Sequence, residues 1–281
     1  MLTVISFFSE GHVLIEDIPG VGKTVLALTL AKSIGLKFGR IQCTSDLLPS
    51  DITGFNVFKK EKSAFEFIKG PIFNDIVLVD EINRAMPKTQ SAFLEAMEER
   101  QVSIENATFK LSPNFFIIAT QNPLEHYGTY PLPDSQLDRF IMKFSIGYPE
   151  KEIEKNILKE GDIKKEIFKI SPYIEEKEVF HIKNEINKVK VSEKILTYLV
   201  DIAEKTRKHK DIYIGLSTRA LLDIVKCAKT YAFYCNRDFV IPEDIKFLSR
   251  YVFSHRIVLK SHNINQEILI SEIINEVQIP Y

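Results

Sequence analysis

The residues best suited to chemistry lie in the segment 17–24, whose sequence is DIPGVGKT. An apolar run at 12–16 precedes this glycine-containing loop, and a helical pattern begins at Lys23. In such a loop, backbone N–H groups and the positive end of the following helix surround an anionic phosphate. Lys23 would contact the terminal phosphates of a nucleotide, and the Thr24 hydroxyl would ligate Mg²⁺. The residues expected to contact the nucleotide are Asp17, Pro19, Gly20, Val21, Gly22, Lys23, Thr24 and Val25.

One position of this loop departs from the common phosphate-binding pattern. That pattern begins with glycine, whereas Asp17 stands at the corresponding place in this chain. A Gly-Lys-Thr tripeptide is a weak signal on its own, and an ordinary turn at Pro19-Gly20 is the alternative interpretation. The strand pattern before the loop and the helical pattern after it favour phosphate binding over a simple turn.

Two adjacent carboxylates mark the end of another apolar run. The run 76–80 (IVLVD) is typical of a buried strand, and Glu81 follows its last residue, Asp80. Carboxylates at the tip of a buried strand need a cation or a polar partner. Asp80 is expected to hold the Mg²⁺ shell and Glu81 to polarise the attacking water. A solvated strand end would account for either carboxylate singly, but it fits the pair poorly, so the pair predicts nucleotide hydrolysis.

Three further side chains are candidates for the nucleotide site, but the sequence around each of them is less specific. Asn122 follows the apolar run 115–120, where an amide could hydrogen-bond to water or the γ-phosphate, although Asn-Pro is also common in turns. Arg139, in the sequence LDRF, could stabilise the transferring phosphoryl group of a neighbouring subunit. Arg219, in GLSTRA, could close over the γ-phosphate as part of a lid. Either arginine, taken alone, also fits an ordinary surface residue.

The elements that must position these residues change in character along the chain. Residues 1–149 alternate short β-rich runs with helical patterns, which is typical of a parallel sheet covered by helices. A helix is predicted at 88–99. Hairpins are predicted at 55–68, turning around 59–62, and at 102–111, turning at 105–106. These patterns predict an α/β nucleotide-binding domain.

The remaining residues, 150–281, have helical rather than strand periodicity. Apolar positions recur at helical spacing in three segments, and Ser217 and Pro242 suit the starts of two of the helices. The apolar positions are Ile195, Leu199 and Ile202, then Ala220, Ile224 and Ala228, then Ile245, Leu248 and Val252. An all-helical second domain is therefore predicted.

Composition limits the class of protein. The 281 residues are 45% hydrophobic and carry a formal net charge of −1, which provides no strong field toward nucleic acid or an anionic membrane. The cysteines, Cys43, Cys227 and Cys235, show no metal-binding spacing and fit a reduced, intracellular protein. No apolar run is long enough to span a membrane. A cytoplasmic location, with no nucleic-acid partner and no membrane segment, is predicted.

Taken together, these motifs resemble the MoxR family of AAA+ ATPases from His12 to Ile257. An aspartate is common in that family at the position of Asp17. The matching segments, in chain order, are HVLIEDIPGVGKT, RIQCTSDLLPSDITG, GPIF, DEINRAMPKTQSAFLEAMEERQV, ATQNPLEHYGTYPLPDSQLDRF, GYP, GLSTRA, RDFVIPEDI and SHRI.

The resemblance implies a P-loop αβα core with a parallel five-stranded sheet, followed by a helical AAA+ lid. The two predicted hairpins are similar to the inserts that mark the helix-2-insert branch of these proteins. The implied roles are Walker A for Lys23 and Thr24, Walker B for Asp80 and Glu81, sensor 1 for Asn122, a finger acting in trans for Arg139, and sensor 2 for Arg219.

The same resemblance implies assembly and partners. Family members form rings, usually hexamers, and act as ATP- and Mg²⁺-dependent chaperones that assemble or mature enzyme complexes, often with a von Willebrand A-domain protein. They also carry a segment before the first strand that packs against adenine, whereas eleven residues precede His12 here. Either the natural start lies upstream or the adenine pocket is incomplete.

Two other functions stay open at this point. One is a nucleic-acid motor of the same branch, with the hairpin 55–68 or the basic cluster 205–210 contacting DNA; the near-neutral charge argues against it. The other is a nucleotide-binding scaffold that does not hydrolyse ATP; the intact pair of Asp80 and Glu81 argues against it.

Overall fold

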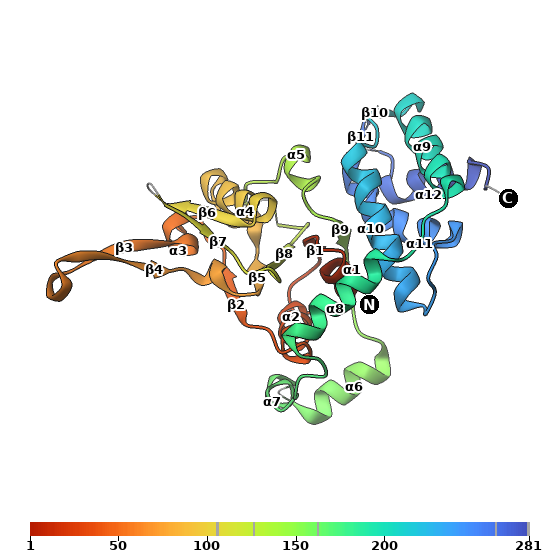
Figure 1. The fold of residues 1–281 in the computed structure, drawn as a ribbon. Helices are drawn as coiled ribbons and strands as arrows, with labels where there is room; N and C mark the ends of the chain where they lie inside the picture. Colours follow the sequence, from red (N-terminus) through yellow and green to blue (C-terminus); the bar gives the residue numbers. More distant parts are fainter. Residues whose placement is uncertain (105–106, 126, 162, 262, 280–281) are drawn as a thin grey trace. The chain divides into compact units, whose positions relative to one another are not determined.

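The chain folds into two compact units, each built from separated segments of the sequence. The computed structural model describes residues 1–104, 107–125, 127–161, 163–261 and 263–279 (Figure 1). The core unit consists of 14–132 and 144–176, and the lid unit consists of 1–13, 133–143 and 177–281. The division into domains 1–149 and 150–281 stays a prediction.

A five-stranded sheet carries the apolar runs seen in the sequence. Its strand order is β2-β5-β8-β1-β9. β2 and β8 pair with β5 in parallel, with Gln42 opposite Asp80 and Val79 opposite Ala119. The strands are β1 (Val13–Glu16), β2 (Phe38–Gln42), β5 (Ile76–Asp80), β8 (Phe116–Gln121) and β9 (Met142–Phe144). The prediction of a P-loop type of parallel five-stranded sheet is confirmed.

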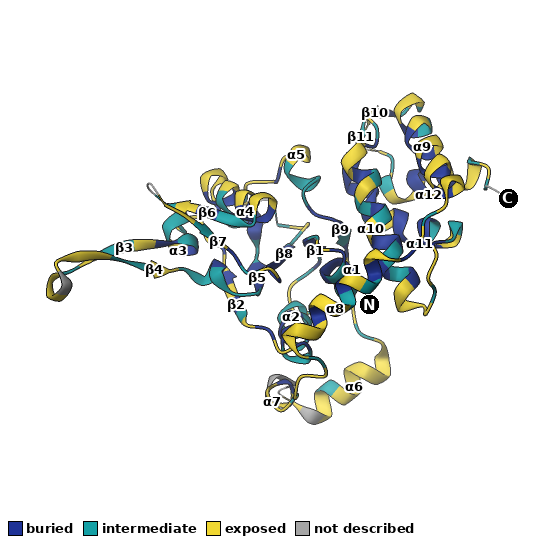
Figure 2. Ribbon diagram, in the orientation of Figure 1, coloured by how far each residue is buried: buried dark blue, intermediate teal, exposed yellow. Residues whose placement is uncertain are grey.

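The central strands are buried on both faces because helices cover the sheet. Residues 76–79 of β5 and 117–119 of β8 are fully buried (Figure 2), as expected for parallel strands that lie between helical layers. Among the core helices, α4 begins with Pro87, one residue before the predicted start, and buries Phe93, Leu94 and Met97. The core helices are α2 (Lys23–Ser33), α3 (Pro49–Thr53), α4 (Pro87–Glu99), α6 (Lys151–Glu160) and α7 (Ile163–Phe168), with short 3₁₀ turns η2 (Pro71–Phe73) and η3 (Ile82–Arg84).

Both predicted hairpins pair as antiparallel strands. In the first, β3 (Gly54–Lys59) pairs with β4 (Ala64–Lys69) across the 3₁₀ turn η1 (Lys60–Lys62), close to the predicted turn. The second pairs β6 (Gln101–Ile104) with β7 (Ala107–Lys110), and its predicted turn at 105–106 lies outside the described residues.

An aromatic contact joins the two hairpins. The ring of Phe67 on β4 stacks on Phe109 of β7 at a centroid distance of 4.3 Å, and it meets Phe73 edge-on at 5.7 Å. The base of the first hairpin is therefore anchored to the second hairpin and to the turn η2. Further along the same hairpin, Phe58 and Phe65 are exposed.

The lid unit is mainly helical, as predicted. Ser217 caps α10, its hydroxyl accepting a hydrogen bond from the Ala220 N–H at 3.2 Å, and Pro242 occupies the first turn of α11. The predicted apolar faces of three helices are buried. The helices are α1 (Leu2–Phe8), α5 (Asp134–Leu137), α8 (Glu176–Asn187), α9 (Glu193–Lys208), α10 (Thr218–Tyr234), α11 (Pro242–Val252) and α12 (Gln266–Glu276), with the 3₁₀ turn η4 (Ser254–Arg256).

One feature of the lid unit goes beyond the helical prediction. β10 (Ile212–Ile214) and β11 (Val258–Leu259) form a short antiparallel ribbon.

Within the described part of the chain, a helix with both the length and the apolar character needed to cross a bilayer is absent.

Candidate functional site

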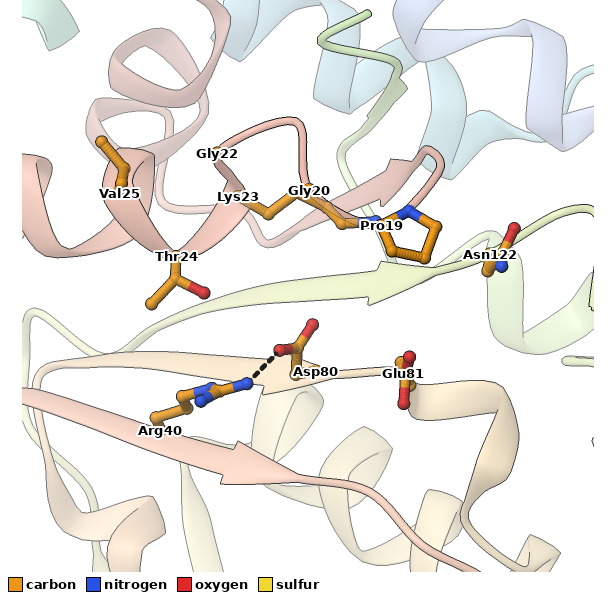
Figure 3. Close-up of a pocket in the computed structure, with 10 residues that line it drawn as sticks. All are labelled: Pro19, Gly20, Gly22, Lys23, Thr24, Val25, Arg40, Asp80, Glu81 and Asn122. Atoms are coloured by element: carbon orange, nitrogen blue, oxygen red, sulfur yellow. Dashed lines mark hydrogen bonds and ion pairs between the residues drawn. The ribbon is translucent and has the colours of Figure 1, made fainter. Parts of the chain in front are cut away.

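A cavity of about 320 Å³ opens in the core unit at the carboxyl edge of the sheet (Figure 3). The loop after β1, the ends of β2 and β5, and the residue after β8 all contribute to it, because parallel strands end at the same edge. The lining residues are Pro19, Gly20, Gly22, Lys23, Thr24, Val25, Arg40, Asp80, Glu81 and Asn122. The structure therefore brings Lys23, Thr24, Asp80, Glu81 and Asn122 together from three separate motifs.

The glycine loop owes its shape to backbone conformation. Gly20 and Gly22 have φ angles of 89° and 92°, a region that side-chain-bearing residues rarely adopt. A Cβ at either position would meet no atom of the described residues within 4 Å, so crowding does not explain these glycines. Gly22 is the N-cap of α2 and provides no side-chain cap, which leaves the first N–H groups of the helix available to an anion.

Lys23 bonds to its own loop. Its Nζ donates a hydrogen bond to the Asp17 carbonyl oxygen at 2.6 Å. Burial lowers the pKa of Lys23 from its ordinary value, while the negative charges of Asp17, Asp80 and Glu81 act in the opposite direction. The ammonium group lies in a cavity where three carboxylates favour its charged form, and a phosphate entering that cavity would find the cation already in place.

Asp80 is held on both of its carboxylate oxygens. Oδ1 accepts a hydrogen bond from the Thr120 hydroxyl at 2.7 Å, and Oδ2 lies 2.7 Å from Nη2 of Arg40 (Figure 3). The Thr120 oxygen also accepts the Glu81 N–H at 3.0 Å. One buried hydroxyl on β8 thus orders the end of the neighbouring strand β5.

Glu81 adopts a backbone conformation that is uncommon for a residue with a side chain. Its φ and ψ angles are 58° and 51°, in the left-handed region, and such residues gather at functional sites. Its Oε2 accepts a hydrogen bond from Gln42 Nε2 at 2.8 Å and lies 3.2 Å from Nε of Arg84. Arg84 also pairs with Glu125. The carboxylate at the cavity is therefore held by one amide and one guanidinium group.

Asn122 lies where β8 ends, at the edge of the same cavity. Its Oδ1 accepts a hydrogen bond from the Leu124 N–H at 3.1 Å, which forms a turn over Pro123. Asn122 is therefore both a turn residue and a residue of the site, because it forms a local turn and also lines the cavity with Asp80 and Glu81.

Sequence reasoning missed the contribution of β2. Arg40 and Gln42 contact the two carboxylates, yet no strand was predicted at 38–42. A signal was present, because Gly39 and Ile41 are buried whereas Arg40 and Gln42 are exposed, which is the alternation of a half-buried strand. The run is only five residues long and contains a glycine directly before Arg40, which weakens the strand signal.

Arg139 and Arg219 belong to the lid unit and are described within it. Nη1 of Arg219 lies 3.9 Å from Oδ2 of Asp138, the residue before Arg139. Among the described residues, those that line the cavity do not include either arginine. The predicted roles of both arginines in catalysis stay predictions.

The fold and the cavity together define a class of protein. A parallel five-stranded sheet with a Gly-Lys-Thr loop at its carboxyl edge, joined to a helical lid, is the arrangement of an AAA-type ATPase. Residues 12–142 match the family model "ATPase family associated with various cellular activities (AAA)", and residues 204–277 match the AAA lid domain.

Relatives of known sequence narrow that class. The chain is 43% identical to the uncharacterized protein YeaC of Bacillus subtilis, over 100% of this chain and 89% of the relative. It is 37% identical to Chaperone MoxR1 of Mycobacterium tuberculosis, over 99% of this chain and 76% of the relative. A crystal structure of a candidate ATPase from Cytophaga hutchinsonii superimposes with a TM-score of 0.92 at 39% identity, covering 99% of this chain and 88% of that one. The chain belongs to the MoxR family of AAA+ ATPases.

Proposed function

We propose that this protein binds ATP with Mg²⁺, hydrolyses it to ADP and phosphate, and uses the resulting motions to remodel a partner protein. The observation that carries the proposal is the convergence of the glycine loop, Lys23, Asp80 and Glu81 on one cavity. A cavity with a cation on one side and two carboxylates on the other suits a metal-bound polyphosphate.

Each group of the cavity has a task in this reaction. The N–H groups of 20–24 hold phosphate oxygens, and Lys23 exchanges the Asp17 carbonyl oxygen for a phosphate oxygen. Glu81 accepts a proton from a water molecule as the water oxygen attacks the γ-phosphorus and the bond to the β-phosphate oxygen breaks. Gln42 and Arg84, which hold the Glu81 carboxylate, orient it for this step.

The donor set of the cavity fits a magnesium ion. The Thr24 hydroxyl and the Asp80 carboxylate are oxygen ligands of the kind that Mg²⁺ prefers, and both line the same cavity as Lys23. The ion supplies neutralisation of phosphate charge when bound. Asp80 now pairs with the exposed guanidinium of Arg40, an exchangeable partner that metal binding would replace.

The remaining site residues complete the proposal. Asn122 would orient the attacking water or the γ-phosphate from the edge of the cavity. Arg139 would act on the nucleotide of a neighbouring subunit, and Arg219 would close on the γ-phosphate from the lid. The role of Arg139 requires a neighbouring subunit, and we propose a homo-oligomeric ring, a hexamer by family resemblance, because closed heterologous contacts give every site a neighbour. Domains 1–149 and 150–281 would be its moving parts.

The client is proposed by family alone. A relative is named a chaperone, so we infer chaperone-like assembly or metal-cofactor maturation of a partner complex, with a von Willebrand A-domain protein as a partner. A Glu81→Gln variant that binds ATP without hydrolysing it should retain the client longer than the wild-type protein does. Capture by this variant with ATP, compared with the same variant without nucleotide, tests this part.

The ATPase proposal is tested by phosphate release from the purified chain with Mg²⁺. Wild-type protein should hydrolyse ATP, Lys23→Ala should abolish turnover, and Glu81→Gln should keep ATP binding while losing turnover. Lys37→Ala, which removes an exposed lysine of the core unit, is the matched control and should retain activity. A wild-type protein that binds ATP without Mg²⁺-dependent turnover would instead be a nucleotide-binding scaffold.

The finger in trans is tested by mixing two inactive variants. Arg139→Ala subunits have an intact site but lack the finger, and Lys23→Ala subunits have the finger but a defective site. Mixed rings should therefore regain part of the wild-type turnover. Mixtures as inactive as their components, in rings shown to exchange subunits, would contradict this role of Arg139.

A further inference from the structure

The aspartate that replaces the first glycine of the loop is buried and fully hydrogen-bonded. Asp17 is 6% exposed. Its Oδ2 accepts three hydrogen bonds, from the Ser145 hydroxyl at 2.9 Å and from the N–H groups of Ile146 and Gly147, each at 2.7 Å. Its Oδ1 accepts the Ile18 N–H at 2.9 Å. All of these residues belong to the core unit.

The carboxylate joins two segments that are far apart in the sequence. Ser145, Ile146 and Gly147 directly follow β9 and lead toward α6. A glycine at position 17 would remove the acceptor of the Ile146 and Gly147 N–H groups. Ile146 is exposed and Gly147 is half-buried, so the consequence of this loss is a segment 145–147 that is no longer tied to the loop. The side chain of Asp17 thus forms a connection to the segment 145–147 that a glycine at this position could not form.

The backbone of Asp17 makes two further connections. Its N–H donates to the Gln121 carbonyl oxygen at 3.1 Å, next to Asn122. Its carbonyl oxygen accepts the hydrogen bond from Lys23 Nζ at 2.6 Å. The residue therefore contacts the segment 145–147, the end of β8 and the lysine of the loop at the same time.

The charge of Asp17 is retained in the fold. Desolvation by burial raises its pKa, but the hydrogen bonds from Gly147, Ser145, Ile146 and Ile18 outweigh it and hold the pKa below the ordinary value. An ionised acceptor forms stronger hydrogen bonds with these donors than a neutral one would.

We propose that Asp17 is a positioning residue for ATP, whose carboxylate anchors the phosphate loop to the segment 145–147 and thereby holds Lys23 in place for the phosphates. This inference rests on the proposed ATPase function. It differs from a direct contact role, because the carboxylate of Asp17 acts through the loop and its anchor. Loss of the anchor should weaken ATP binding while leaving the chemical groups at Asp80 and Glu81 intact.

The test compares Asp17→Ala with Asp17→Asn in ATPase assays and in amide hydrogen exchange. Asp17→Ala should raise KM for ATP roughly tenfold while kcat at saturation changes less than about threefold, the pattern of lost binding rather than lost chemistry. Exchange at the amides of Ile146 and Gly147, measured without nucleotide, should accelerate about tenfold or more. Asp17→Asn keeps one acceptor oxygen and should lie between wild type and Asp17→Ala in both measurements.

Asp51→Ala is the matched control, because Asp51 also accepts a backbone hydrogen bond in the core unit, from the Leu48 N–H at 2.9 Å, but lies outside the cavity. It should leave KM and the exchange at 146–147 unchanged. Unchanged KM and exchange in Asp17→Ala would overturn the proposal, as would the same result in Asp17→Asn if the alanine variant does not fold. If wild-type protein lacks ATPase activity, the exchange experiment still tests the anchor, and the two proposals fail separately.

Discussion

Each compact unit contains a cluster of oppositely charged side chains, and the two clusters differ in the solvent exposure of their arginine. At the cavity of the core unit, Arg40 pairs with Asp80 while the arginine side chain is 46% exposed. In the lid unit, the Arg256 side chain is 0% exposed. It donates to Asp223 at 2.8 Å and to the Phe140 carbonyl oxygen at 2.9 Å, and it lies 3.5 Å from Asp138.

The difference separates charges that can change partners from charges that cannot. An exposed ion pair contributes little to stability, so Asp80 can exchange Arg40 for another cation at low cost. A buried arginine that loses its carboxylates leaves uncompensated charge in a poorly hydrated site. Arg256 therefore fixes the segment 138–140 within the lid unit, and this segment carries Arg139.

The largest effect should come from breaking the buried cluster. Arg256→Ala leaves Asp138 and Asp223 without their shared cation and should lower the free energy of unfolding by about 3–5 kcal/mol. Urea denaturation followed by circular dichroism measures this loss. A decrease below about 1 kcal/mol would show that the buried and exposed clusters do not differ in the way proposed.

The second-largest effect should be a pH dependence of the stability, caused by a histidine in the buried cluster. His255 is 3% exposed, beside Arg256, and its ring nitrogen Nε2 lies 2.9 Å from the Phe140 carbonyl oxygen. Burial, followed by the neighbouring Arg256 charge, holds the pKa of His255 well below its usual 6.5. Below pH 6.5 the unfolded chain binds a proton that the folded chain does not, so stability should fall as the pH falls, by up to about 1.4 kcal/mol per pH unit.

This dependence is measured by denaturation between pH 7 and pH 5 in wild type and His255→Asn. The asparagine variant should lose this part of the slope, because it has no imidazole to protonate. His181→Asn, at an exposed position on α8, is the control and should keep the wild-type slope. Equal slopes in wild type and His255→Asn would contradict the assignment of a buried neutral histidine.

The smallest effect should come from the exposed cluster. Arg40→Ala removes the partner of Asp80 but leaves the carboxylate hydrogen-bonded to Thr120 and accessible to water. The free energy of unfolding should change by less than about 1 kcal/mol, measured as for Arg256→Ala. A loss as large as that of Arg256→Ala would mean that the cavity pair is structural and not exchangeable.

Much of the site could be predicted because its signals are local. The loop 17–24 and the pair Asp80–Glu81 each lie within a few residues of a continuous apolar strand, so their placement at a sheet edge follows from strand and turn patterns. Arg40 and Gln42 were missed because their strand is short and only half buried. The three donors to Asp17 at 145–147 could not be found, because a separation of more than a hundred residues leaves no periodicity to detect.

Local sequence patterns suffice to place the individual structures and the chemistry that they carry: a glycine loop opening a helix, two carboxylates ending a strand, and a helical second half. Which of these structures meet depends on the packing of the folded chain. The strand order places β2 and β8 on either side of β5, and this order brings Gln42 to Glu81 and Thr120 to Asp80. Strand order depends on packing of whole elements against one another, and no short stretch of residues encodes it.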